Sequence, residues 1–123
     1  MNDTDLPQPS LLLIAYASTL KPGGDTTLLD QILTASQRNN DAQDITGCLG
    51  IEGRNIIQII EGPPAAVEAL FEVIRADPRH EGIVLLHRQE RQERLFPGWR
   101  MVRRPTTDLY LFLENAKVQP FRT

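Results

Sequence analysis

The strongest constraint on this chain is a glutamine in the middle of an apolar segment, Ile56-Ile57-Gln58-Ile59-Ile60. The four flanking isoleucines predict a strand that is buried on both faces, because β-branched side chains pack well on a pleated surface. The amide of Gln58 carries both donors and acceptors, and each group left unpaired in a core costs roughly 1–3 kcal/mol. A fold that buries this strand must therefore place polar partners beside Gln58.

Two further polar residues lie in comparable surroundings. Tyr16 falls within the apolar run Leu11-Leu12-Leu13-Ile14-Ala15-Tyr16-Ala17, and Asn40 follows an amphipathic helix expected at 26–39. The apolar stripe of that helix ends in small and polar residues, which is unusual for a surface that only packs. Tyr16, Asn40 and Gln58 could therefore line one polar pocket.

The remaining pattern alternates between strands and helices. Strands are predicted at 10–17, 45–52, 55–61, 83–86 with a continuation toward Arg91, and 99–103. Helices are predicted at 26–39, from 62–64 to about 76, and at 106–116. The turn at 52–55 favours an antiparallel hairpin. This βαββαββ order indicates an α/β (α+β) sandwich of the ferredoxin-like kind, with a mixed five-stranded sheet, two helices on one face and a C-terminal helix.

Composition limits the classes of function. The 123 residues suit one domain, expected at 10–103, between a leader at 1–9 and a helical extension at 104–123. A net charge of −3 argues against a dedicated nucleic-acid binder, and the arginine-rich stretch 88–104 is typical of a solvated face. No apolar run approaches the roughly 20 residues that span a membrane, and the polar N-terminus is unlike a signal peptide, so we expect a cytoplasmic protein.

Several residues also have purely structural interpretations. Cys48 is the only cysteine, which excludes an intrachain disulfide and makes a zinc site improbable. Glu61 precedes a helix start, where a carboxylate favours the helix dipole. The apolar side of that second helix is expected to comprise Ala66, Val67, Leu70, Val73 and Ile74. Trp99 after Pro97-Gly98 suits a core anchor, and His80 near a helix end suits a structural role.

Six segments in this order resemble the BLUF family, the sensors of blue light using flavin. They are Ile14-Ala15-Tyr16-Ala17-Ser18, Ser36-Gln37-Arg38-Asn39-Asn40, Ile45-Thr46-Gly47, Gln58-Ile59-Ile60-Glu61-Gly62-Pro63, Asp77-Pro78-Arg79-His80 and Arg94-Leu95-Phe96-Pro97-Gly98-Trp99-Arg100-Met101. The resemblance runs from about residue 10 to 103. The chain departs from it in the hairpin at 51–55 and at Ile56 and Ile57, where relatives often carry aromatic residues.

The resemblance implies a noncovalently bound flavin, usually FAD, with FMN or riboflavin possible. It implies that Tyr16 is the electron and proton donor, and that Gln58 is the switch between the Tyr16 hydroxyl and the flavin N5/O4 edge. The implied cofactor contacts are Asn40 at O4 and N3–H, Asn39 near O2, Ile32 and Ile74 on the two ring faces, and Arg79 with its neighbour His80 toward the phosphate side. Trp99 and Met101 fall in the implied signalling segment, and the sequence leaves open which of them is beside the flavin.

The implied function is a photosensory flavoprotein, not an enzyme, that signals to a separate protein or within an oligomer. One alternative is a flavin-free ferredoxin-like domain that binds partner proteins through the back of the sheet or the terminal helix. Another is an acylphosphatase-like hydrolase on the same fold. That reaction needs a phosphate-binding loop with an arginine beside the first strand, and residues 17–24 offer Ser18 and Lys21 but no arginine.

Overall fold

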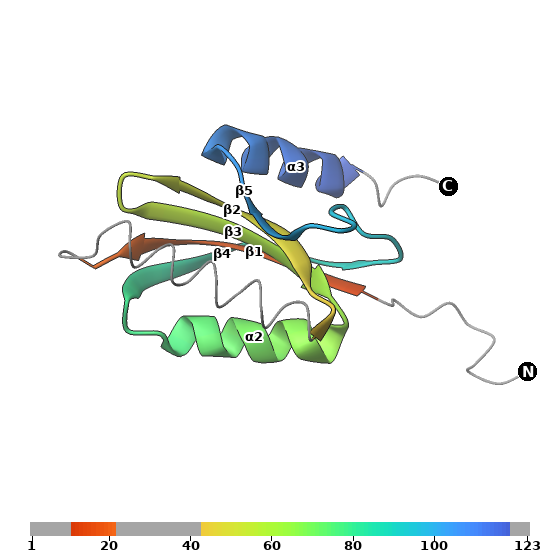
Figure 1. Cartoon of the computed structure of the whole chain (residues 1–123), viewed down its shortest axis with the longest axis horizontal. Helices are drawn as coiled ribbons and strands as arrows, with labels where there is room; N and C mark the ends of the chain where they lie inside the picture. Colours follow the sequence, from red (N-terminus) through yellow and green to blue (C-terminus); the bar gives the residue numbers. More distant parts are fainter. Residues whose placement is uncertain (1–10, 22–42, 119–123) are drawn as a thin grey trace, which may run out of the picture.

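A computed structural model describes residues 11–21 and 43–118 of the chain (Figure 1). The described helices and strands are β1 (Leu11–Leu20), β2 (Thr46–Glu52), β3 (Asn55–Gly62), α2 (Pro64–Ala76), β4 (His80–Arg91), β5 (Arg100–Arg103) and α3 (Thr106–Val118). The helix expected at 26–39, with Ile32 and Asn39, lies outside the described residues, as does Asn40.

The five strands form one sheet in the order β4-β1-β3-β2-β5. Neighbouring strands are antiparallel except β2 and β5, which are parallel, so the prediction of a mixed five-stranded sheet is confirmed. The β2–β3 hairpin is also confirmed, since Glu52 pairs with Asn55 across a turn in which Gly53 has a φ of 62°. A glycine suits that turn because a positive φ places no side chain in conflict with the backbone.

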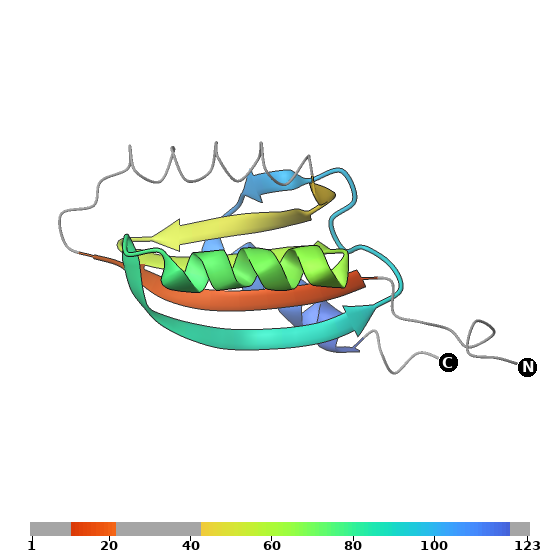
Figure 2. The same cartoon turned by 90° about the horizontal axis from the view of Figure 1, so that it is seen from below.

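The sheet is buried on both faces, which explains the long apolar runs of β1 and β3. Leu12 and Ile14 of β1 pack in a core with α2, whereas Leu13 and Ala15 pack in a second core with α3. Figure 1 shows α2 and α3 on opposite sides of the sheet, and Figure 2 shows α2 lying along it. We call these two regions the α2 layer and the α3 layer.

Each described helix contacts the sheet through positions spaced i, i+3, i+4 and i+7. In α2 these are Val67, Leu70, Phe71 and Ile74, and in α3 they are Leu109, Phe112, Leu113 and Ala116. The expectation that Val73 faces the core was wrong, because its side chain is 67% exposed and Phe71 packs there instead. Val73 lies off the stripe that the helical period defines.

Strands β1 and β4 are longer than the sequence predicted. Residues 18–20 extend β1 and residues 80–82 extend β4, because the two strands pair with each other as far as Leu20 and His80. Backbone pairing of this kind does not depend on apolar side chains, so polar residues at the strand ends gave no signal of it. Neither described helix is long and apolar enough to cross a membrane.

Gly47, near the start of β2, lies where the strands leave no room for a side chain. A Cβ atom at this position would lie 1.9 Å from the carbonyl oxygen of Ile59, which is backbone and cannot move aside as a flexible side chain can. Gly47 also donates its N–H to the carbonyl of Trp99 at 2.9 Å, just before β5 begins. A side chain at this position would therefore force β2 and β3 apart beside the start of β5.

We expect Gly47→Ala to destabilise the protein by about 3 kcal/mol, because a strand must shift to relieve the overlap. Gly53→Ala is the matched control, since nothing lies within 4 Å of its Cβ position and only the positive φ opposes it. Gly53→Ala should lower the free energy of unfolding by about 1 kcal/mol. Urea denaturation followed by circular dichroism measures both, and equal losses would contradict the argument from close approach.

Candidate functional site

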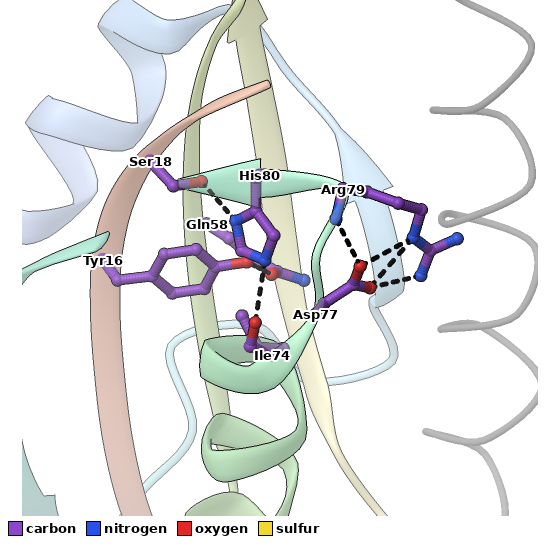
Figure 3. A network of polar contacts seen from close by, with 7 residues as sticks. All are labelled: Tyr16, Ser18, Gln58, Ile74, Asp77, Arg79 and His80. Carbon is purple, nitrogen blue, oxygen red and sulfur yellow. Dashed lines mark hydrogen bonds and ion pairs between the residues drawn. The ribbon is translucent and has the colours of Figure 1, made fainter. Parts of the chain in front are cut away.

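Tyr16 and Gln58 form a buried polar pair at the centre of the sheet. They lie directly opposite each other in the β1–β3 register, and their side chains are 4% and 5% exposed. The Tyr16 hydroxyl donates a hydrogen bond to Oε1 of Gln58 (Figure 3). The expectation that a polar group must meet Gln58 is therefore confirmed, and Tyr16 provides it.

The other end of the Gln58 amide faces Met101. Its Nε2 atom lies 3.2 Å from the Met101 sulfur, and a thioether is only a weak acceptor. Gln58 therefore has two amide hydrogens and, among the described residues, one weak partner for them. This NH₂ group can therefore donate to a stronger oxygen acceptor without giving up a strong hydrogen bond.

A β-bulge directs Met101 toward Gln58. In the β2–β5 pairing, Gly47 faces Arg100 and the next residue, Cys48, faces Val102, so Met101 is the extra residue of the bulge. Its φ is 75°, which is rare for a residue other than glycine and costs of order 1–3 kcal/mol. Bulges of this kind redirect a side chain and are common next to functional sites.

Because of the bulge, Trp99 and Met101 face opposite layers although they are two residues apart. Trp99 packs in the α3 layer, with its ring 5.4 Å from Phe96 and 6.0 Å from Phe112, and the guanidinium of Arg104 lies 5.9 Å from it. Met101 is fully buried in the α2 layer. Of the two residues in the implied signalling segment, Met101 is therefore the one that contacts Gln58.

His80 links three elements next to the Tyr16 ring. Its Nε2 atom lies 2.8 Å from the carbonyl oxygen of Ile74 at the end of α2, and its Nδ1 atom lies 2.8 Å from Oγ of Ser18 on β1 (Figure 3). A carbonyl can only accept, so Nε2 carries the hydrogen, and in the neutral ring Nδ1 accepts from the Ser18 hydroxyl. Since the His80 ring lies 6.4 Å from that of Tyr16, this link stabilises the surroundings of the tyrosine.

Arg79 lies beside His80 and binds Asp77. The guanidinium donates to both carboxylate oxygens, with Nε at 2.9 and 3.0 Å, and the Arg79 backbone N–H also donates to Asp77 at 2.9 Å (Figure 3). The side-chain hydrogen bond from Arg79 lowers the pKa of Asp77 below its usual value. The same bond raises the pKa of Arg79, so the pair remains charged and closes the turn between α2 and β4.

Tyr16 keeps its proton over a wide range of pH. Burial, and secondarily the negative charge of Asp77, raise the pKa of its hydroxyl far above the usual value. The ring is also held by Phe71, whose centroid is 5.8 Å away. The site therefore presents a neutral phenol whose only polar atom is directed at Gln58.

Sequence reasoning missed three residues around this site. Ser18 was considered only as part of a phosphate-binding loop, and Phe71 was not singled out, although the helical spacing with Val67 and Ile74 could have found it. The third is Glu61, whose expected role at the start of α2 was wrong. Its side chain is fully buried and accepts hydrogen bonds from the backbone of Leu95 and Phe96, far along the chain.

Within residues 11–21 and 43–118, no three or more metal-ligating side chains lie together as a group that could hold an ion. A cavity of about 400 Å³ is lined by residues that include Ile57, Val84, Thr106 and Tyr110, so it opens in the α3 layer and not toward the Tyr16 hydroxyl. Cys48 is a buried thiol. Its burial is the larger cause, and the negative charge of the nearby Glu61 the smaller one, of a pKa raised to about 12, so the thiol is unreactive.

The family of this fold is given by a match over most of the described chain. Residues 11–102 match the BLUF family, described as "Sensors of blue-light using FAD". The chain belongs to the BLUF family. The sequence resemblance and its expected fold are thereby confirmed, and the Tyr16–Gln58 pair lies within the matched BLUF region.

Solved structures of BLUF proteins have the same fold. BlrB, described as a BLUF protein in its dark state, is 32% identical with a TM-score of 0.75, and the match covers 87% of this chain and 81% of BlrB. BlrP1 of Klebsiella pneumoniae, solved with FMN and cyclic diGMP, is 32% identical with a TM-score of 0.73, over 85% of this chain and 30% of BlrP1.

Curated relatives carry the BLUF region within longer proteins. A photoactivated adenylate cyclase subunit beta of Euglena gracilis is 39% identical over 57% of this chain and 8% of its own length. The blue light- and temperature-regulated antirepressor BluF of Escherichia coli (strain K12) is 30% identical over 62% of this chain and 19% of its own length. The BLUF chain thus matches less than a fifth of either relative.

The raised pKa of Tyr16 predicts that its phenol keeps its proton near pH 10, where an unperturbed tyrosine ionises. We expect the difference in tyrosinate absorbance between the unmodified chain and Tyr16→Phe to stay close to zero near pH 10 while both proteins are folded. That difference should appear only once the protein unfolds, and circular dichroism of the same samples reports when this happens.

The same shift determines the sign of the pH dependence of stability. The folded pKa of Tyr16 lies above the unfolded one, so its contribution is fully present below about pH 10 and is lost as the pH rises toward the folded pKa. Urea midpoints above pH 10 should therefore fall less steeply for Tyr16→Phe than for the unmodified chain. A tyrosinate signal near pH 10 that the folded unmodified chain shows and Tyr16→Phe lacks would contradict the assignment of Tyr16 as a buried, neutral phenol.

Proposed function

We propose that this BLUF chain is a blue-light photoreceptor whose light-sensitive unit is the Tyr16–Gln58 pair. The observation that carries the proposal is the hydrogen bond from the buried Tyr16 hydroxyl to Oε1 of Gln58, inside the region that matches the family. Burial of both side chains is supporting evidence, because a polar pair in a dry core costs stability unless it is used or fully satisfied.

The residues that are described fit a flavin on the α2 side of the sheet. The Gln58 amide has a donor facing a thioether, which a flavin carbonyl could replace as acceptor. Ile74 would contact the ring from α2, and Arg79 and His80 would lie on the phosphate side. Ile32, Asn39 and Asn40 complete the proposed cofactor contacts and lie outside the described residues. We propose FAD, which the family description names, with FMN as the other candidate.

A bound flavin would absorb the blue light and would act as the acceptor of one electron and one proton. Tyr16 would supply both from its phenol, which is neutral and therefore still carries the proton, and would take both back as the dark state returns. Gln58 can reverse the direction of its hydrogen bonds because an amide both donates and accepts. A changed bond from Gln58 to the flavin carbonyl would shift absorption to the red.

The signal is proposed to leave the site through β5. Met101 contacts Gln58 directly, and the same short strand continues from Trp99, which packs against Phe112 of α3. We propose that the output is contact with a separate protein or within an oligomer, with no reaction catalysed by the domain itself. A cytoplasmic location stays a prediction.

We expect the purified chain to be yellow with bound flavin and to show a small, thermally reversible red shift after blue light. Tyr16→Phe should keep the flavin, because the ring still packs against Phe71, but should lose the shift with the donor hydroxyl. Tyr110→Phe is the control and should respond normally. Absorption spectra before and after illumination decide the question. A chain that FAD, FMN and riboflavin all fail to reconstitute would support the flavin-free interaction domain instead.

Gln58→Leu tests the switch, since leucine has a similar volume but no hydrogen-bonding group. We expect the variant to fold and bind flavin, to absorb slightly to the blue in the dark, and to lack the light-induced shift. Its stability should fall by roughly 1–3 kcal/mol, because the Tyr16 hydroxyl loses its partner in a dry site. Difference spectroscopy on the flavin-loaded variant measures the response, and a full red shift would show that another residue is the switch.

A further inference from the structure

Glu61 is a fully buried carboxylate that the proposed photochemistry does not use. Its Oε1 accepts the backbone N–H of Leu95 at 2.8 Å, and its Oε2 accepts the backbone N–H of Phe96 at 2.7 Å and the Thr46 hydroxyl at 2.9 Å. All three partners are donors, which suits the acceptor-only character of a carboxylate. One side chain of β3 thus holds β2 and the connection from β4 to β5.

Arg94 extends this contact to the start of β2. Its Nη1 donates to the Thr46 hydroxyl oxygen at 2.8 Å, which leaves the Thr46 proton free to be donated to Glu61. Its Nη2 donates to the backbone carbonyl of Asp44 and forms an ion pair with the Asp44 carboxylate, both at 2.9 Å. Three consecutive residues, Arg94, Leu95 and Phe96, are therefore bonded to the ends of β2 and β3. We call this set of contacts the Glu61 clamp.

A short series of backbone contacts connects the Glu61 clamp to Met101. The N–H of Trp99 donates to the carbonyl of Phe96 at 3.1 Å, and the carbonyl of Trp99 accepts from Gly47 at 2.9 Å. The next residue, Arg100, pairs with Gly47, and the bulge at Met101 follows at once. Only four residues separate Phe96 from Met101, so the position of the clamp limits where the bulge can form.

We propose that Glu61 is a positioning residue for the light response. Its carboxylate holds the β4–β5 connection so that the bulge presents the Met101 sulfur to Gln58, and loosening it lets Met101 leave that position. This inference rests on the proposed function, because the response that it tunes is the red shift of the flavin. Charge-assisted hydrogen bonds from backbone N–H groups to a carboxylate are among the stronger ones in proteins. We therefore expect their loss to loosen the backbone of the whole β4–β5 connection.

Glu61→Gln tests the clamp, because the substitution replaces one accepting oxygen by an NH₂ group. That donor group then faces an N–H or O–H donor, and the hydrogen bond between them is lost. We expect amide exchange at Leu95 and Phe96 to accelerate on the order of tenfold. Emission of Trp99, the only tryptophan, should change as its packing loosens. The red shift should remain, since Tyr16 and Gln58 are intact, but its dark recovery should become several-fold faster.

Glu68→Gln is the matched control. It makes the same chemical change at an exposed carboxylate of α2 that pairs with Arg88 at 2.5 Å, and it should leave exchange at 95–96, Trp99 emission and recovery unchanged. Thr46→Val provides a milder variant, which keeps Glu61 and removes only the hydroxyl between it and Arg94. It should shift all three measurements in the same direction by less.

Two results would overturn the proposal. The first is a Glu61→Gln protein that is less stable but keeps normal Trp99 emission and normal recovery, which would make Glu61 purely structural. The second, available if that variant does not fold, is a Thr46→Val protein that matches the unmodified chain in all three measurements. If the unmodified chain gives no red shift, the photoreceptor proposal fails, whereas amide exchange and Trp99 emission in the dark still decide the clamp.

Discussion

The hydrogen bond between Tyr16 and Gln58 is the interaction around which this sheet is organised. Strands β1 and β3 are covered by apolar side chains on both faces, so a phenol and an amide at their centre have little access to water. Each would be costly alone, and their direct opposition in the register pairs the Tyr16 hydroxyl with the carbonyl oxygen of Gln58. A one-residue slip of β3 would move Gln58 into the α3 layer and leave Tyr16 without its acceptor. The pairing of strands and the chemistry of the site are therefore determined together.

The surrounding contacts hold this pair in one arrangement. His80 joins Ser18 of β1 to the end of α2, and the Asp77–Arg79 pair closes the adjacent turn. On the other side, the bulge in β5 turns Met101 away from the layer that holds Trp99. Because a thioether is a weak acceptor, Met101 contacts Gln58 without fixing the orientation of its amide.

Much of the fold could be predicted from the sequence because local rules apply to it. The isoleucines around Gln58 indicated a doubly buried strand, the turn at Gly53 indicated the hairpin, and the pattern at 106–116 indicated the terminal helix. The need of Gln58 for a polar partner could also be predicted, because it follows from solvation alone. Those features depend on residues close in sequence or on one energetic requirement.

The remaining features depend on contacts between distant residues. Glu61 was expected to favour the start of α2, but two of its three partners are backbone N–H groups 34 and 35 residues away, which no side-chain pattern reveals. The bulge at Met101 breaks the alternation that would place it on the same side as Trp99, and the sequence Trp99-Arg100-Met101 carries no glycine to signal it. The pairing of β1 with β4 at their ends likewise involves polar residues.

The separation of Trp99 from Met101 by the sheet has an evolutionary consequence. The α2 layer holds the hydrogen-bonded pair of Tyr16 and Gln58, whereas the α3 layer is apolar packing in which volume matters more than identity. Substitutions on the outer side of α3, away from Trp99, leave the surroundings of Tyr16 unchanged because the central strands are interposed. A chain built in this way can acquire a new outer surface, and with it a new partner, without a change at Tyr16 or Gln58.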